Sequence, residues 1–277
     1  MKDIYAYNEI IKKARTFFQD IKGFVEVPAQ SRQSILAACE DPTTISEYTF
    51  NGIKFPLPQT GQMWLEEELL SHLEINGVFC ITTSYRDEKN VIEGRHDKIF
   101  PMFEFESKGN IDDLKKLERE FLLYLGFSEG ALLNYEEACK KYGVQSLEAE
   151  HEGEIAKDFG NVVFLQMFPQ RTHPFWNMKH FGQGIYSKVD VLILGMETIG
   201  SAERSVNVKE MRENFHKISG GRYAGLLFSR FGKERVTEEL DKYLSHKMFP
   251  RFGGGIGVTR LARAMYLEGL LEKRGVV

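Results

Sequence analysis

A run of glycines that leads into an arginine, near the C-terminal end of the chain, has a composition suited to nucleotide binding. Four glycines lie within Phe252–Leu261, and Arg260 follows them. Glycine lacks a Cβ, so a flat ligand could approach the backbone closely, and the start of a following helix would offer free N–H groups to phosphate. Arg260 would add a planar cation for phosphate oxygens or a base. The spacing matches neither a Walker A loop nor a dinucleotide-binding fingerprint. The alternative interpretation of the glycines is therefore an ordinary tight turn.

A second stretch, residues 85–106, combines cations, carboxylates and an aromatic ring. Two short strands joined by a charged loop would place Arg86 beside Phe100. Arg86 could pair with the α-phosphate of a nucleotide, and Phe100 could stack on its base. Glu88 could accept a hydrogen bond from an adenine amino group, and His96 could serve as a loop cation for the terminal phosphates. Each residue alone would be interpreted as an ordinary surface position.

Two carboxylates, Asp190 and Glu197, lie in an otherwise apolar stretch. Buried carboxylates are rarely left unpaired, so each is expected to form a salt bridge or to coordinate a hard cation. Mg²⁺ prefers oxygen ligands and usually binds together with substrate phosphates. Arg204 follows in the same segment and is a candidate for bidentate pairing with a substrate carboxylate.

The elements that must position these residues are predicted from periodicity and turn signals. Apolar spacing predicts helices over 3–21, 64–73, 208–218, 238–245 and 258–269, and Asn110 begins a helix that Gly126 ends. Strands are expected over 24–27, 78–85, 102–106, 162–167 and 189–196, a hairpin over 48–57, and a strand-like segment at 248–250 before the glycines. Because strands come in adjacent pairs, we expect an α+β fold in which helices pack on an antiparallel sheet.

Composition limits the class of protein. The chain has 277 residues, of which 42% are apolar and 27% charged, so it can bury a substantial core. No apolar run approaches the roughly 20 residues of a membrane helix. Three scattered cysteines without a CxxC pattern indicate a reducing cytoplasm. The net charge of −4 argues against a general nucleic-acid binder, although residues 203–277 carry 15 Lys and Arg against 9 Asp and Glu.

Taken together, these segments resemble the catalytic core of class II aminoacyl-tRNA synthetases. The family's motif 2 is similar to Tyr85–Glu88, Arg95-His96, Phe100 and Glu106 of this chain. Its motif 3 is similar to Gly253–Leu261, and its motif 1 is similar, in a degenerate form, to Gly23–Pro28. Segments of the aspartyl/asparaginyl branch are resembled by Pro58–Trp64, Pro174–Lys179 and Glu197–Arg204. Six segments in the family's order make a specific pattern, and the chain also resembles the stand-alone, archaeal-type asparagine synthetases.

The resemblance implies the family's antiparallel sheet flanked by helices, and attack of an amino-acid carboxylate on the α-phosphate of ATP. The products would be an aminoacyl-adenylate and pyrophosphate, and the cofactors ATP and Mg²⁺. The implied catalytic residues are Arg86 and Arg260. ATP would be bound by Arg86, Glu88, His96, Phe100, Gly255, Gly257 and Arg260, the amino acid by Gln59, Thr60, Gln62 and Arg204, and Mg²⁺ by Asp190 and Glu197.

The chain also departs from the family pattern. Relatives that charge tRNA carry an anticodon-binding domain, whereas 22 residues precede Gly23 here, so we expect one catalytic domain over residues 1–277. Leu65 stands where aspartate-specific relatives have a lysine, which puts aspartate in doubt as the substrate. Thr259 and Ile99 replace acidic residues of motifs 3 and 2. Glu203 would either face the substrate or support Arg204 from behind.

Three functions follow from this comparison. The leading hypothesis is a tRNA-independent, AMP-forming ligase similar to asparagine synthetase, which joins aspartate and ammonia. The alternatives are a truncated aspartate- or asparagine-type tRNA ligase and a non-catalytic paralogue, and the intact Arg86, Glu197 and Arg260 argue against the last. The expected partners are a small amino acid and a second copy of the chain, paired through the motif 1 segment. Binding of tRNA is disfavoured, and no membrane association is expected.

Overall fold

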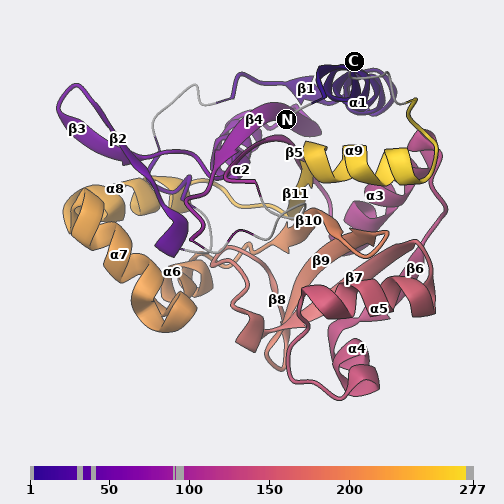
Figure 1. Ribbon diagram of the computed structural model, residues 1–277. Helices are drawn as coiled ribbons and strands as arrows, with labels where there is room; N and C mark the ends of the chain where they lie inside the picture. The colour runs from indigo at the N-terminus through magenta and orange to yellow at the C-terminus, as the bar shows by residue number, and fades with distance from the viewer. Residues whose placement is uncertain (1–2, 30–33, 39–41, 90, 92–96, 273–277) are drawn as a thin grey trace.

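A mixed sheet forms the centre of the structure (Figure 1). The computed structural model describes residues 3–29, 34–38, 42–89, 91 and 97–272. Within these residues the strand order is β1-β4-β5-β11-β10-β9-β7-β6, with β8 also paired to β9, and β2 and β3 form a separate hairpin. The strands are β1 Val25–Glu26, β2 Glu47–Phe50, β3 Ile53–Pro56, β4 Gly77–Tyr85, β5 Ile99–Lys108, β6 Ala131–Asn134, β7 Val162–Pro169, β8 His180–Gly182, β9 Ile185–Ile193, β10 Glu197–Arg204 and β11 Arg251–Gly257.

Neighbouring strands are antiparallel across the middle of the sheet, while the pairs at its two edges are parallel. β1 pairs with β4 and β6 pairs with β7 in the parallel sense. Parallel neighbours need a long crossover, which two helices supply between β6 and β7. The expected α+β class is confirmed, and the sheet is mixed rather than purely antiparallel.

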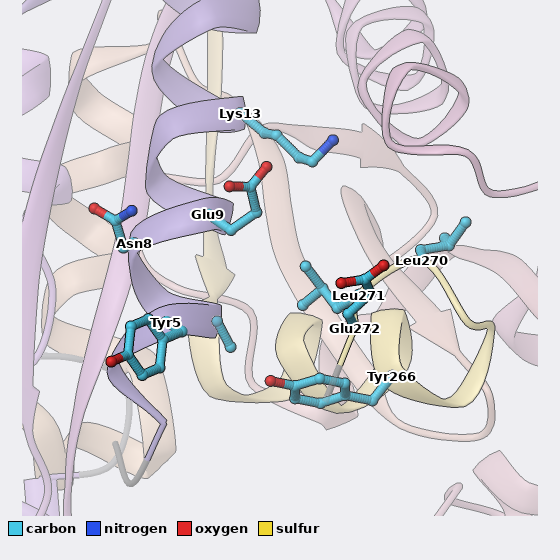
Figure 2. Close-up of a pocket in the computed structure, with 9 residues that line it drawn as sticks. Tyr5, Asn8, Glu9, Lys13, Tyr266, Leu270, Leu271 and Glu272 are labelled. Atoms are coloured by element: carbon cyan, nitrogen blue, oxygen red, sulfur yellow. The ribbon is translucent and has the colours of Figure 1, made fainter. Parts of the chain in front are cut away.

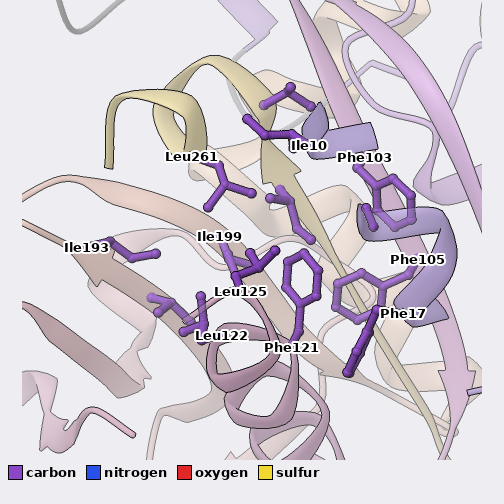
Figure 3. Close-up of a cluster of buried hydrophobic side chains, with 14 of the residues drawn as sticks. Ile10, Phe17, Phe103, Phe105, Phe121, Leu122, Leu125, Ile193, Ile199 and Leu261 are labelled. Atoms are coloured by element: carbon purple, nitrogen blue, oxygen red, sulfur yellow. The ribbon is translucent and has the colours of Figure 1, made fainter. Parts of the chain in front are cut away.

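Helices cover both faces of this sheet. On one face, α1 (Ile4–Arg15), α3 (Ile111–Leu125) and α9 (Val258–Leu267) bury their apolar residues against the strands. In Figure 3, Phe121 and Leu125 of α3 lie beside Phe105 and Ile199 of the sheet and Leu261 of α9. The remaining helices are α2 Gln62–Ser71, α4 Tyr135–Tyr142, α5 Ala149–Phe159, α6 Val208–Lys217, α7 Arg222–Phe231 and α8 Lys233–Leu244. Each helix in the described ranges is too short or too polar to cross a membrane.

The face opposite α3 is covered less uniformly. α2 packs on β4 there through Leu65 and Leu69, and α6, α7 and α8 pack beside α2. α4 and α5 cover Val163 and Leu165 of β7. The centre of this face, over β10 and β11, carries small and charged residues instead of an apolar layer.

Local sequence signals located several elements correctly. The Asn110 side chain accepts from the N–H groups of Asp112 and Asp113, and the Asp113 carboxylate accepts from the Asn110 N–H in return. Gly126 ends this helix at a φ of 102°. The Asn51-Gly52 turn has both residues at positive φ and joins β2 to β3 as predicted.

Other elements were not predicted. β6, β8, β10, α4, α5 and α7 lack a strong periodic pattern. The strand expected over 189–196 ends at Ile193, because Leu194 and Gly195 form a turn with positive φ values. The first helix is regular only to Arg15 and continues to Ile21 as a wider π-type turn.

The glycine run is itself a strand, so the strand expected at 248–250 lies instead at Arg251–Gly257, and the tight turn that was the alternative does not form. β11 pairs with β5 on one side and β10 on the other. A Cβ at Gly253 would lie 2.1 Å from the Glu106 carboxyl carbon and 2.4 Å from the carbonyl oxygen of Phe105. The glycine therefore makes room for a neighbouring side chain within the protein.

Replacing Gly253 by alanine is expected to destabilise the protein by about 1–3 kcal/mol, because the Cβ would displace Glu106 or the backbone of β5. The matched control is Gly225→Ala, in the exposed part of α7, where a Cβ meets nothing within 4 Å. That change should be neutral or slightly stabilising. Urea unfolding of both variants measures the difference, and equal effects would contradict the close packing at Gly253.

Candidate active site

Two rows of paired residues cross the centre of the sheet on the face opposite α3. Side chains of paired residues share a face, and alternate residues along a strand share it too. The first row is Asp190, Gly200, Gly255 and Glu104, and the second is Lys188, Ala202, Gly253 and Glu106. Small residues therefore occupy the middle of this surface, with charged residues at both ends.

A separate cavity of about 290 Å³ lies on the other side of the sheet (Figure 2). Tyr5, Glu9 and Lys13 of α1 line it together with Tyr266 of α9 and Leu270, which follows that helix. Both helices pack on the α3 face, where the Phe103 and Phe105 side chains point away from Glu104. This cavity is therefore not part of the surface that carries the predicted site residues.

Arg86 and Phe100 lie side by side at one end of the small-residue surface. The Arg86 guanidinium carbon is 5.6 Å from the centroid of the Phe100 ring. β4 and β5 hold them there, because Phe100 pairs with Ser84 and the Arg86 N–H donates to the Lys98 carbonyl oxygen over 2.8 Å. The predicted juxtaposition is confirmed, and Glu88 follows on the same segment, half-buried. His96 lies outside the described residues.

Arg260 and Glu197 meet on the β10 side of this surface. They lie at the same end of the strands as Phe100, because Gly257 pairs with Met102. Arg260 lies in the first turn of α9, directly after Gly257, and its Nη1 donates to the Glu197 carbonyl oxygen over 2.8 Å. The same nitrogen is 3.6 Å from the Glu197 carboxylate. The Glu197 N–H donates to the Glu152 carboxylate of α5 over 2.9 Å. Glu197 is thus held through its N–H, its carbonyl and its side chain.

Asp190 and Glu197 converge over Gly200. The position of a Cβ at Gly200 is 3.0 Å from Glu197 Oε1 and 3.7 Å from Asp190 Oδ1. The described residues contain no group of three or more His, Cys, Asp or Glu that could bind a metal. Two carboxylates fit Mg²⁺ when phosphates and water complete its shell. The donor set is therefore compatible with a metal that arrives with a nucleotide.

The residues of the Gln59–Gln62 segment that were predicted to bind the amino-acid substrate contact other groups of the protein. Gln59 is buried, and its amide donates to Thr44 over 2.7 Å. The Thr60 hydroxyl donates to the Glu104 carboxylate. Burial raises the pKa of Glu104 above its ordinary value. The Gln62 amide donates to Glu66 over 2.8 Å and to Asn177 over 3.3 Å. These hydrogen bonds hold the segment against β5 and α2 beside the small-residue surface.

Arg204, predicted to pair with a substrate carboxylate, is buried and already paired with a carboxylate of the protein. Its Nε donates to Glu106 Oε1 over 3.0 Å, and Glu66 Oε1 is 3.8 Å away. Burial raises the pKa of Glu106 to about 7, against the lowering effect of Arg204. Glu203 faces the other side of β10, where it accepts from the Ile111 N–H and the Lys179 ammonium. Glu203 therefore neither faces the substrate surface nor contacts Arg204 through its carboxylate.

Sequence reasoning missed a buried ionic network behind these residues. Glu66 Oε2 accepts from Arg251 Nε (2.9 Å) and Nη2 (2.7 Å) and from the Tyr243 hydroxyl (2.6 Å), and Glu66 Oε1 accepts from Asn177 (2.6 Å). Burial would raise the pKa of Glu66, but Arg251 and Arg204 outweigh it and hold the pKa below its ordinary value. The available signal was the position of Glu66, three residues after Met63 and four before Leu70, on the apolar face of the helix.

Glu118 of α3 lies beneath the same strands on the opposite face. It is buried, and the Ser201 hydroxyl interacts with its carboxylate. The neighbouring Ser201 hydroxyl donates to the Val189 carbonyl oxygen over 3.0 Å. Burial raises the pKa of Glu118 to about 8 against the lowering effect of the Ser201 hydroxyl, and the charge of Asp190 adds to the rise.

Stability should therefore fall as the pH rises from about 5 to 8. The unfolded chain releases the Glu118 proton near the ordinary value of 4.5, whereas the folded chain keeps it until about 8. Glu118→Leu should remove this penalty, so its stability gain over wild type grows with pH, to roughly 4–5 kcal/mol near pH 8, at about 1.4 kcal/mol for each of roughly 3.5 pKa units. Glu238→Leu, at an exposed position of α8, is the control. A pH-independent gap in urea unfolding would contradict the buried acid.

Comparisons with known proteins agree with this arrangement. Residues 2–271 match the family described as tRNA synthetases class II (D, K and N). The asparagine–tRNA ligase of Desulforamulus reducens is 27% identical over 203 residues, which are 61% of this chain and 45% of that protein. The ligase of the same name from Pelotomaculum thermopropionicum is 24% identical, over 92% of this chain and 63% of that protein. The chain thus spans less than two thirds of these relatives.

Solved structures show the same fold. Asparaginyl-tRNA synthetase from Pyrococcus horikoshii, complexed with asparaginyl-adenylate, superposes with a TM-score of 0.78 at 20% identity, covering 94% of this chain and 64% of that one. The Entamoeba histolytica asparaginyl-tRNA synthetase, also with asparaginyl-adenylate, gives 0.74 at 18% identity, covering 96% and 63%. Since the family match extends over nearly the whole chain, the protein belongs to the class II tRNA synthetases of the D, K and N group.

Proposed function

We propose that this protein activates an amino acid with ATP, forming an aminoacyl-adenylate and releasing pyrophosphate. The observation that carries the proposal is the placement of two arginines around one small-residue surface. Arg86 lies against the Phe100 ring at one side, and Arg260 lies against Glu197 at the other. Between them, Gly200 and Gly255 are paired and carry no side chain. A nucleotide lying across this surface would place its base at Phe100 and its phosphates between the arginines.

The chemistry needs charge stabilisation more than proton transfer. A carboxylate oxygen of the amino acid attacks the α-phosphorus, the bond to the bridging oxygen of the β-phosphate breaks, and pyrophosphate leaves with that electron pair. Arg86 would stabilise charge on the α-phosphate and Arg260 on the departing phosphates. Mg²⁺ at Asp190 and Glu197 would neutralise further phosphate charge. Because the nucleophile is already a carboxylate, the protein's task is to position the two reactants.

For the complete reaction we propose a tRNA-independent ligase similar to asparagine synthetase. Aspartate would be activated, ammonia would attack the acyl carbon with its lone pair, and AMP would leave as the ammonia nitrogen loses a proton. The negative net charge of the chain supports a small acceptor over a polyanionic tRNA. This proposal requires a cation to balance the second carboxylate of aspartate, and Arg204 could do so only by leaving Glu106.

A second candidate is activation of asparagine, favoured by the surroundings of Arg204. Two carboxylates, Glu106 and Glu66, already lie within 4 Å of its guanidinium. A substrate carboxylate brought to this point would be repelled, whereas a carboxamide could accept from Arg204 and donate to a glutamate. Two relatives are named asparagine–tRNA ligases, and two solved neighbours contain asparaginyl-adenylate.

Pyrophosphate release, measured across the amino acids, separates these candidates. Release with aspartate that yields asparagine when ammonia is added supports the synthetase-like reaction. Release with asparagine that continues only when tRNA is supplied supports the tRNA ligase. Each assay is run with and without ammonia and with and without tRNA, so that one acceptor is identified by the turnover it restores.

We also propose that the protein is a homodimer joined through α1 and the edge strand β1. Exposed apolar side chains gather there, with Ile4 69%, Tyr5 58%, Ile21 55% and Val25 42% exposed. Sedimentation at micromolar concentration should give a dimer, and Ile21→Glu should shift it towards monomer. Leu132→Glu, at an equally exposed position on β6, is the control. A wild-type monomer under these conditions would contradict the assignment.

A further inference from the structure

Lys188 lies on the floor of the candidate site, although nothing in the sequence pattern had marked it. It precedes Asp190 by two residues on β9, so both side chains point to the same face. The Lys188 ammonium is 3.0 Å from Asp190 Oδ2, and the two side chains are only 18% and 12% exposed. On its other side, the ammonium lies 4.3 Å from the centroid of the Phe168 ring. A carboxylate and an aromatic face thus hold this lysine in place.

This contact occupies one of the two carboxylates that fit a divalent cation. Asp190 Oδ1 and Glu197 Oε1 converge over Gly200. Lys188 already neutralises Asp190, and Arg260 lies beside the Glu197 carboxylate at 3.6 Å. A free divalent ion would therefore meet a pair of carboxylates whose charge is balanced, with an ammonium close to its binding position.

We propose that Lys188 is a resident countercation of Asp190 that excludes the free divalent ion and releases Asp190 when the ion arrives with the polyphosphate of ATP. The inference rests on the proposed nucleotide and metal site. Phosphate oxygens would give both the metal and the Lys188 ammonium new anionic partners, so the cost of separating the ion pair is offset only in the nucleotide complex. The long lysine side chain can leave Asp190 while remaining near Phe168.

Binding of Mn²⁺, followed by electron paramagnetic resonance without nucleotide, tests this directly. Lys188→Met keeps the length of the side chain and removes its charge, so it should bind free Mn²⁺ at least tenfold more tightly than wild type. Adding Asp190→Asn to that variant should abolish the gain. With a non-hydrolysable ATP analogue present, the affinity difference between wild type and Lys188→Met should shrink to less than threefold.

The matched control is Lys141→Met. Lys141 also pairs with a carboxylate, Asp158 at 3.3 Å, and lies over an aromatic ring, that of Phe159 at 5.5 Å. It is on α4, so its replacement should leave Mn²⁺ affinity unchanged. Equal Mn²⁺ affinity of wild type and Lys188→Met, or a gain that persists after Asp190→Asn, would overturn the inference.

This readout is independent of the proposed reaction. A wild-type protein that activates an amino acid while Lys188→Met gains no Mn²⁺ affinity would refute the role of Lys188 alone. A tenfold gain in a protein that activates no amino acid would retain that role and refute the proposed function.

Discussion

Arg86→Ala is expected to lower the rate of amino-acid-dependent pyrophosphate exchange by about 10²–10³ while leaving the fold intact. The loss corresponds to about 3–4 kcal/mol, the usual effect of removing one charged donor from a developing phosphate charge. Arg86 is only partly buried and stacks on Phe100 rather than filling the core, so little packing is lost. Arg260→Ala should have an effect of the same size, because Arg260 is the second arginine beside this surface.

Two controls make this result specific. Arg212→Ala removes an exposed arginine of α6 that pairs with Asp241 of α8. The pyrophosphate-exchange rate of this variant should match that of wild type. Arg86→Lys keeps the charge but loses the planar, bidentate geometry, so it should recover only part of the activity. Arg86→Ala with near-normal exchange would remove Arg86 from the site.

Arg251→Met should destabilise the protein by about 3–5 kcal/mol, because it leaves the Glu66 carboxylate buried without its principal cation. Both side chains are completely buried, and the next guanidinium, that of Arg204, is 3.8 Å from Glu66 Oε1 and already paired with Glu106. Unfolding in guanidinium chloride, extrapolated linearly to zero denaturant, measures the loss in free energy of unfolding.

The double variant Glu66→Gln/Arg251→Met separates the loss of a partner from the loss of packing. Replacing both charges removes the uncompensated carboxylate, so the double variant should be more stable than Arg251→Met alone. A double variant that is as unstable as the single one would show that packing of the Arg251 side chain dominates. Arg251→Met within 1 kcal/mol of wild type would contradict the ionic network.

Local signals predicted the parts of the fold that local physics determines. The α3 helix has its N-cap and its terminating glycine in the sequence, and the β2–β3 hairpin has its Asn-Gly turn. Arg86 and Phe100 could be placed together because they lie on two strands that pair with each other. These predictions need only neighbouring residues or one hairpin.

β10 and β11 could not be predicted in this way. β10 reads ETIGSAER and β11 reads RFGGGIG, and glycine is unfavourable in strands when only intrinsic preference is considered. Gly253 is explained by the Glu106 side chain of the adjacent strand, which is visible only once the register is known. The tertiary environment therefore decides the structure of the segment that carries the strongest motif.

The charges of the site show the same limit. Arg260 contacts Glu197, 63 residues away, and Arg251 contacts Glu66, 185 residues away, so no local pattern could join either pair. The family resemblance brought Arg260 and Glu197 into one site, but it did not indicate that Arg204 is paired with Glu106. That pairing matters for the substrate, because it decides whether a carboxylate or a carboxamide is accommodated.

The most direct test of the account is exchange of labelled pyrophosphate into ATP by the wild-type protein, with each amino acid in turn and without tRNA or ammonia. We expect exchange that requires both Mg²⁺ and one particular amino acid, with aspartate and asparagine as the leading candidates, because adenylate formation is reversible and needs no acyl acceptor. Absence of exchange with every amino acid, from a folded protein that binds ATP, would contradict the proposal that this site forms an aminoacyl-adenylate.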